Sequence, residues 1–157
     1  ISDSVKTNAD VSKAYVRNAQ VVVMKEDKVA DYKDAASMKE LKFAAENGSA
    51  GEAAIKENGL DGKYTPVAKQ TDALLEVMSG ASDACVIDIT MAKAMTGEGT
   101  SYANLGIGIE LTSEEYGIGF RKGSDLTEKV NGIIGELKAD GTLDKLAEKY
   151  SLNLADL

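Results

Sequence analysis

The sequence of 157 residues contains no histidine and no tryptophan, and it has one cysteine, Cys85, and one proline, Pro66. Without histidine, the Ser-His and Cys-His catalytic pairs are excluded, and a single cysteine removes the usual metal-ligand clusters. We therefore expect no metal and no other cofactor. Cys85 lies in an apolar stretch, which is typical of a small core residue.

Basic residues are fewer than acidic residues. Lysine and arginine number 18 against 26 aspartates and glutamates, which gives a net charge of −8. This balance disfavours nucleic acid or an anionic membrane as a partner. With 43% hydrophobic residues, the chain has enough apolar side chains to bury a core, either as one domain or as two small lobes.

The pattern of apolar and turn residues predicts alternating strands and helices. It favours an α/β fold, with a mostly parallel sheet flanked by helices and further helices at the C-terminus. The predicted strands cover residues 19–25, 41–45, 64–68, 84–87, 105–111 and 116–121. The predicted helices cover residues 32–41, 50–58, 71–79, 89–95 and 124–140, with a last one that begins at 142.

Apolar side chains recur at helical spacing in three of these helices. In the helix that Thr71 is expected to cap, we predict that Leu74, Leu75 and Met78 face inward. The two C-terminal helices carry longer apolar stripes that need to be covered. Their members are Leu126, Val130, Ile133, Ile134 and Leu137 in the first helix, and Leu143, Leu146, Ala147 and Tyr150 in the second.

A loop of small residues, Gly48-Ser49-Ala50-Gly51, connects a predicted strand to a predicted helix. The first amides of a helix lack intrahelical partners and lie at the positive end of its dipole, so such a loop can bind an anion. It lacks the spacing of phosphate and dinucleotide loops, which favours a carboxylate. In the alternative, Asn47 or Ser49 only caps the helix and Gly48 only turns the chain.

One carboxylate, Asp88, ends the apolar stretch at 84–87. It could cap the predicted helix at 89–95, or it could be the counter-ion of a ligand ammonium group. Ligands of open α/β sheets bind beyond the carboxyl ends of the strands, where both Asp88 and the 48–51 loop are expected. The two features therefore predict one site.

Several segments, in the same order, resemble the polar amino-acid substrate-binding proteins of bacterial ABC importers. These are the family 3 solute-binding proteins with a type II periplasmic-binding fold. The segments that carry this resemblance are NAQVVV at 18–23, GSAGE at 48–52, GASDACVID at 80–88, EEYGIGFRKG at 114–123, VNG at 130–132 and LKADGTLDK at 137–145. Together they extend over nearly the whole chain.

The resemblance implies a protein of two α/β lobes that close about hinge strands on one free L-amino acid, without chemistry and so without a catalytic residue. It implies an extracytoplasmic location, in the periplasm or as a cell-surface lipoprotein, and delivery of the ligand to an ABC importer permease. Residues 1–19 would be a remnant of lobe one with the first hinge, 20–118 a complete lobe two, and 119–157 the second hinge with C-terminal helices of lobe one. The chain is thus expected to be a fragment, in which Val5 stands where the family has an arginine.

Site residues follow from the same resemblance. Gly48, Ser49 and Ala50 match the loop that binds the ligand's α-carboxylate, although Ala50 lacks the hydroxyl often found there. Asp88 matches the carboxylate that binds the α-ammonium. Glu46 matches a position that often faces the ligand's side chain, which hints at a cationic or amide-bearing ligand; in the alternative, Glu46 is an ordinary solvent-facing acid.

Two other functions share these residues. The chain could be the ligand-sensing domain of a bacterial receptor, or a dehydratase on the same fold with Asp88 or Glu46 as its acid or base. The apolar stripes of the C-terminal helices need to be covered. Either these helices fold back over lobe two, or two chains pair through them, and of the two we expect the homodimer.

Overall fold

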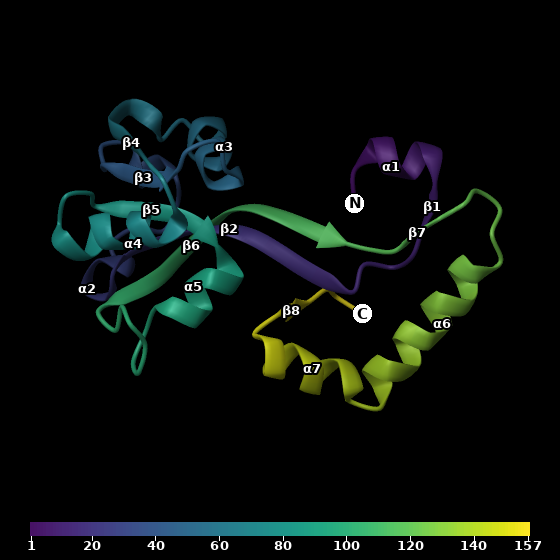
Figure 1. Ribbon diagram of the computed structural model, residues 1–157. Helices are drawn as coiled ribbons and strands as arrows, with labels where there is room; N and C mark the ends of the chain where they lie inside the picture. Colours follow the sequence, from purple (N-terminus) through teal and green to yellow (C-terminus); the bar gives the residue numbers. More distant parts are fainter. The chain divides into compact units, whose positions relative to one another are not determined.

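The computed structural model describes all 157 residues, and the chain divides into two compact units (Figure 1). Unit 1 consists of residues 1–18 and 114–157, and unit 2 consists of residues 19–113. None of the helices has the length and apolar character needed to cross a membrane.

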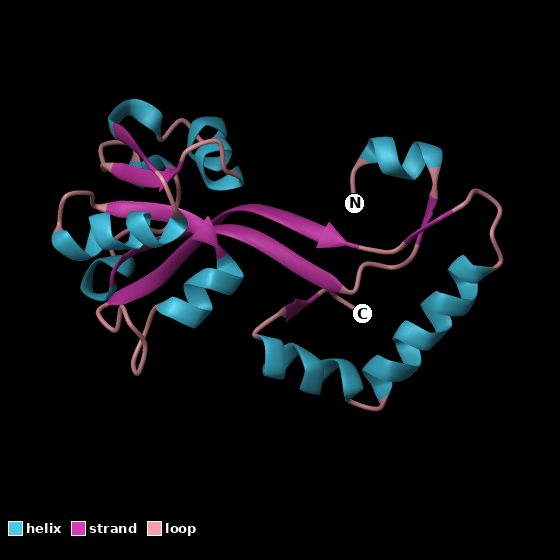
Figure 2. Cartoon of the chain, in the orientation of Figure 1, coloured by secondary structure: helices cyan, strands magenta, loops and turns pink.

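The core of unit 2 is a sheet with the strand order β4-β3-β5-β2-β6 (Figure 2). Its strands are β2 (Val16–Lys25), β3 (Phe43–Glu46), β4 (Tyr64–Val67), β5 (Ala84–Asp88) and β6 (Leu105–Tyr116). Strand β3 is parallel to both of its neighbours, whereas β2 runs antiparallel to β5. The expected α/β class is confirmed, with a sheet that is mixed because β2 reverses direction.

Both faces of this sheet are buried, since its strands contribute alternate residues to two separate cores. Cys85 and Ile87 of β5 belong to one core, and Ala84 and Val86 belong to the other. Helices α4 (Gln70–Ser79) and α5 (Ile89–Met95) contribute to the first core, and α3 (Ala50–Glu57) contributes to the second. This two-sided burial explains why β5 has no polar residue before Asp88.

Helix α4 has a different buried face from the predicted one. Leu74 is buried, as expected, but its buried neighbours are Ala73 and Val77, while Leu75 and Met78 are 56% and 41% exposed. The side chain of Thr71 does not cap the helix, which begins at Gln70.

The predicted helix at residues 32–41 is wrong. The short helix α2 (Glu26–Val29) ends before this segment, and the only helix within it is the short η1 (Ala36–Met38). The carboxylate of Asp34 accepts a hydrogen bond from the Ser37 amide at 2.8 Å, so a local turn replaces helical hydrogen bonds there. A second short helix, η2 (Asp61–Lys63), precedes β4.

Unit 1 contains two strand pairs and three helices. Its elements are α1 (Asp3–Asn8), β1 (Asp10–Val11), β7 (Gly119–Phe120), α6 (Leu126–Ala139), α7 (Thr142–Tyr150) and β8 (Asn153–Leu154). Strand β1 pairs antiparallel with β7, and β8 pairs with the start of β2. Of the strand predicted at 116–121, Tyr116 belongs to the end of β6, and only Gly119 and Phe120 form a separate strand, β7.

The apolar stripes of α6 and α7 are only partly covered. Ile134 is the one stripe residue that is buried. Leu126, Ile133, Leu146 and Tyr150 are all between 44% and 58% exposed.

Helix α3 starts in close contact with β5, and this contact depends on a glycine. A Cβ atom on Gly51 would lie 2.6 Å from the carbonyl oxygen of Val86, a backbone atom that cannot move alone. Gly62 has no atom near the corresponding position and no unusual φ, so it provides a matched control.

We predict that Gly51→Ala destabilises the protein by about 1–2 kcal/mol, because the cost of overpacking exceeds the gain in helix propensity. Gly62→Ala should leave the free energy of unfolding within about 0.5 kcal/mol of the wild type. Urea denaturation of both variants measures the difference. Equal stability of the two variants would show that α3 does not require this close approach.

Candidate functional site

One edge of the unit 2 sheet gathers the predicted site residues. Strands β3, β4 and β5 are parallel, so their carboxyl ends lie at the same edge, and α3, α4 and α5 begin just beyond it (Figure 1). Ser49 precedes α3, and Asp88 is the last residue of β5. The pairing of Ala44 with Cys85 places these two strand ends side by side.

Ser49 caps α3, which confirms the capping role considered for it. Its hydroxyl oxygen accepts a hydrogen bond from the amide of Glu52 at 3.2 Å. Gly48 has a φ of +73°, a conformation that favours glycine and turns the chain into the helix. The amide of Gly48 donates to the Glu52 carboxylate at 2.5 Å, so the first turn of the helix closes on itself.

This arrangement decides which donors remain available for a ligand. The Gly48 amide is already bonded to Glu52, whereas the amides of Ala50 and Gly51 have no acceptor in the chain. The hydroxyl hydrogen of Ser49 is a further donor, since only its oxygen is used in capping. The donors that an anion could use at this loop are therefore two amides and one hydroxyl.

Glu52 is held as a carboxylate by its neighbours. Lys56 bonds its side chain, and together with the Gly48 amide this lowers the pKa of Glu52 below its ordinary value. Tyr64 lies nearby; burial, with a smaller contribution from the charge of Glu52, raises the pKa of Tyr64 to about 12. The Tyr64 hydroxyl donates to the Ala45 carbonyl at 3.3 Å, so this side chain serves the structure of the edge.

Asp88 occupies the N-cap position of α5, but its side chain does not cap the helix. Instead, its Oδ1 accepts a hydrogen bond from Gln20 Nε2 at 2.9 Å, and its Oδ2 accepts one from Gln70 Nε2 at 3.1 Å. The Oε1 atom of Gln70 in turn accepts the Asp88 amide at 3.1 Å. The capping role considered for Asp88 is therefore wrong, because two glutamines draw its carboxylate away from the helix.

Glu46 is the last residue of β3 and is half-buried. Its carbonyl accepts the Ser49 amide at 3.1 Å, which ties the strand end to the start of α3. Its carboxylate has no hydrogen bond or ion pair within the chain. A half-buried carboxylate without a partner is favourable for binding a cation.

Sequence reasoning missed the two glutamines that bond Asp88. Gln20 is 4% exposed and interrupts the apolar stretch of β2, which is the one signal that could have identified it. Gln70 is the first residue of α4 and carries no such signal. The two residues meet Asp88 only through the antiparallel register of β2 and the parallel register of the other strands.

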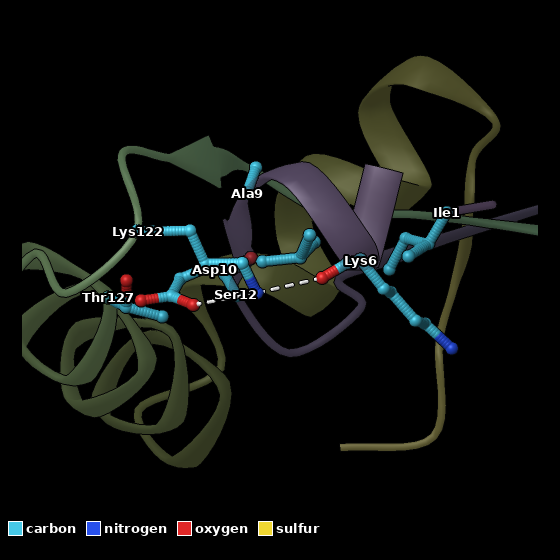
Figure 3. A pocket seen from close by; sticks show the side chains of 8 residues that line it. Ile1, Lys6, Ala9, Asp10, Ser12, Lys122 and Thr127 are labelled. Atoms are coloured by element: carbon cyan, nitrogen blue, oxygen red, sulfur yellow. Dashed lines mark hydrogen bonds and ion pairs between the residues drawn. The ribbon is translucent and has the colours of Figure 1, made fainter. Parts of the chain in front are cut away.

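A separate cavity of about 360 Å³ lies within unit 1 (Figure 3). Lys122 bridges the Asp10 carboxylate at 3.4 Å and the Lys6 carbonyl at 2.9 Å, as the dashed lines show. The hydroxyl of Thr127 lines the same cavity and has no hydrogen-bond partner. Asp10 is the one acidic residue of the lining, and it pairs with Lys122, while Lys6 and the N-terminal residue Ile1 line the same cavity.

Comparison with known families gives one match to almost the entire chain. The family described as bacterial extracellular solute-binding proteins, family 3, matches residues 1–153. The match includes every residue of the edge described above.

Solved structures similar to this chain bind amino acids, as their names state. An ancestral cationic amino-acid solute-binding protein, AncCDT-1, is 29% identical with a TM-score of 0.75, over 96% of this chain and 65% of its own. Another structure of AncCDT-1, 30% identical with a TM-score of 0.63 and the same two coverages, is described as a precursor of cyclohexadienyl dehydratase.

Two bacterial proteins are also similar. An amino-acid ABC transporter substrate-binding protein from Streptococcus pneumoniae, bound to L-arginine, is 27% identical with a TM-score of 0.64, over 98% of this chain and 65% of its own. The L-cystine solute receptor of Neisseria gonorrhoeae, in an unliganded open conformation, is 26% identical with a TM-score of 0.77, over 95% of this chain and 62% of its own. This chain therefore spans somewhat less than two thirds of the length of these proteins.

Proposed function

Because this chain belongs to the bacterial extracellular solute-binding proteins of family 3, we propose that it contributes to binding a free L-amino acid for delivery to the permease of an ABC importer. The observation that carries the proposal is the common sheet edge. An anion seat at the start of α3 and the carboxylate of Asp88 lie at the carboxyl ends of adjacent parallel strands. An α-amino acid carries the two opposite charges that such a pair would bind.

Each site residue has a role in this proposal. Ser49, through its hydroxyl, and Ala50, through its amide, donate to the ligand's α-carboxylate, and Gly48 shapes the loop that presents them. Asp88 binds the α-ammonium group. Binding two charges in a closing cleft requires that both be paired, since an unpaired buried charge is costly.

We further propose that binding occurs by hinge closure of two lobes outside the cytoplasm, in the periplasm or on a cell-surface lipoprotein. Residues 20–118 are assigned to lobe two, and residues 1–19 and 119–157 to parts of lobe one and the hinges. The family's extracellular designation supports the location.

The proposed role is binding without chemistry. The description of AncCDT-1 as a precursor of a dehydratase keeps a dehydratase as the second candidate, with Asp88 or Glu46 as acid or base. A sensing domain of a bacterial receptor would use the same ligand contacts. Mass-spectrometric analysis of a hydroxyl-bearing amino acid incubated with the protein separates binding, which leaves its mass unchanged, from dehydration, which lowers its mass by one water.

The substitution Asp88→Asn tests the proposed function. We expect it to weaken L-amino-acid binding more than tenfold, a loss above ~1.4 kcal/mol, because a neutral amide replaces the counter-ion of the ammonium group. Asp72→Asn removes the same charge from the first turn of α4 and serves as the control. NMR titration of the chain with each common amino acid measures both variants. Equal affinities of the wild type and Asp88→Asn would remove Asp88 from the site.

A second prediction concerns the ligand's side chain and depends on Glu46. We propose a cationic ligand, so arginine, lysine or ornithine should bind better than glutamate. The unpartnered carboxylate of Glu46 supports this, as does the name of the ancestral cationic amino-acid-binding protein. Glu46→Gln should reduce the preference for arginine over glutamate, expressed as the ratio of their dissociation constants, about fivefold or more. Glu57→Gln, on the exposed surface of α3, should leave this ratio unchanged. A thermal-shift panel in which glutamate stabilises the protein most would contradict the proposal.

For the exposed apolar residues of α6 and α7, we propose a homodimer that covers them. Light scattering at several concentrations should give a mass that rises toward that of two chains. The polar substitution Leu146→Ser should return it to that of one chain. A monomeric mass at every concentration would exclude the dimer.

A further inference from the structure

The chain contains two glutamines, Gln20 and Gln70, and both donate to the carboxylate of Asp88. They are 50 positions apart and come from different elements, β2 and α4. We infer that Gln70 and Gln20 are positioning residues that hold the Asp88 carboxylate for the ligand's α-ammonium group. The inference rests on the proposed function.

Gln70 makes the more constraining contact. Its amide group donates to Asp88 Oδ2 at 3.1 Å through Nε2 and accepts the Asp88 backbone amide at 3.1 Å through Oε1. One planar group thus bonds both the main chain and the side chain of the same residue, which fixes the side-chain torsions between them. Gln70 is well placed for this contact, because α4 begins at the same sheet edge where β5 ends.

Gln20, on the neighbouring strand β2, donates a hydrogen bond to the other carboxylate oxygen of Asp88. Its residue pairs in register with Asp88 across the antiparallel β2–β5 ladder, and its Nε2 donates to Oδ1 at 2.9 Å. Gln20 is 4% exposed, in a strand whose next four residues are apolar and buried. Burying a polar amide there is costly unless it is hydrogen-bonded. The hydrogen bond to Asp88 offsets this cost for the Gln20 side chain.

The two contacts also explain why Asp88 does not cap α5. An aspartate at an N-cap position ordinarily accepts a hydrogen bond from the helix's own amides, and such a bond would turn the carboxylate toward α5. Both amide donors are neutral, so they orient the carboxylate without adding a positive charge of their own. A carboxylate held in a fixed orientation is what the binding of an ammonium group requires.

The first test shows whether the contacts exist in solution, independently of any ligand. The side-chain amide signals of Gln20 and Gln70 are the only glutamine amide pairs in a ¹⁵N–¹H spectrum of this chain. Asp88→Ala should move both pairs, because both lose their acceptor. Signals of both glutamines that stay unchanged in Asp88→Ala would overturn the inference.

The second test asks whether the contacts serve the ammonium group. The probes are L-arginine and 5-guanidinopentanoate, which lacks only the α-ammonium, and the readout is the ratio of their dissociation constants in NMR titrations. Gln70→Leu should reduce the preference for L-arginine at least about fivefold. Thr71→Val, at the next position of α4, should leave it unchanged, since the Thr71 side chain has no hydrogen bond.

A merely structural role would weaken both probes equally and leave their ratio unchanged. Gln70→Asn, which keeps the amide but shortens its reach, should also reduce the ratio, and it replaces Gln70→Leu if that variant does not fold. If the wild type prefers L-arginine and both Gln70 variants keep the full preference, the inference is wrong and the proposed function stands. A wild type that does not distinguish the two probes would instead contradict the ammonium contact of the proposed function and, with it, this role of the glutamines.

Discussion

The parallel pairing of β3 with β4 and β5 is the constraint on which the candidate site depends. Parallel strands need crossover helices, and each helix must begin where its strand ends. Helices α3, α4 and α5 therefore all start at one sheet edge, where their unpaired amides and positive dipole ends collect. Two buried cores fix the register of these strands, because a shift by one residue would exchange their faces.

Much of this edge could be predicted from the sequence, because the signals are local. An apolar stretch with one terminal charge identifies Asp88, and a run of small residues before a helix identifies the loop at Gly48 and Ser49. The glutamines could not be predicted, because their contacts with Asp88 join residues 68 and 18 positions apart in the chain. Gln20 depends on the register of β2 with β5, and Gln70 depends on where α4 begins. No short-range pattern encodes such a register.

The wrong predictions have a similar cause. Leu75 and Met78 fit an apolar stripe by spacing, yet α4 packs through Ala73, Leu74 and Val77. Spacing shows that a helix has apolar residues, but the surface it packs on decides which of them are buried. In the segment at 32–41, the bond from Ser37 to Asp34 favours a turn over the predicted helix, which is a competition that residue composition alone does not resolve.

The start of α3 shows how capping and ligand binding can share one helix end. The Glu52 carboxylate accepts a hydrogen bond from the Gly48 amide. Its negative charge lies close to the proposed binding site of the ligand's carboxylate, and by itself this charge would repel an anion. Lys56 bonds the same carboxylate and offsets that charge, with a side chain that is itself half-exposed. The amides of Ala50 and Gly51 then remain under the helix dipole alone, so the cap stabilises α3 without cancelling the field that attracts an anion. In the proposed function, Ala50 contributes its backbone amide, so the missing hydroxyl does not remove this donor.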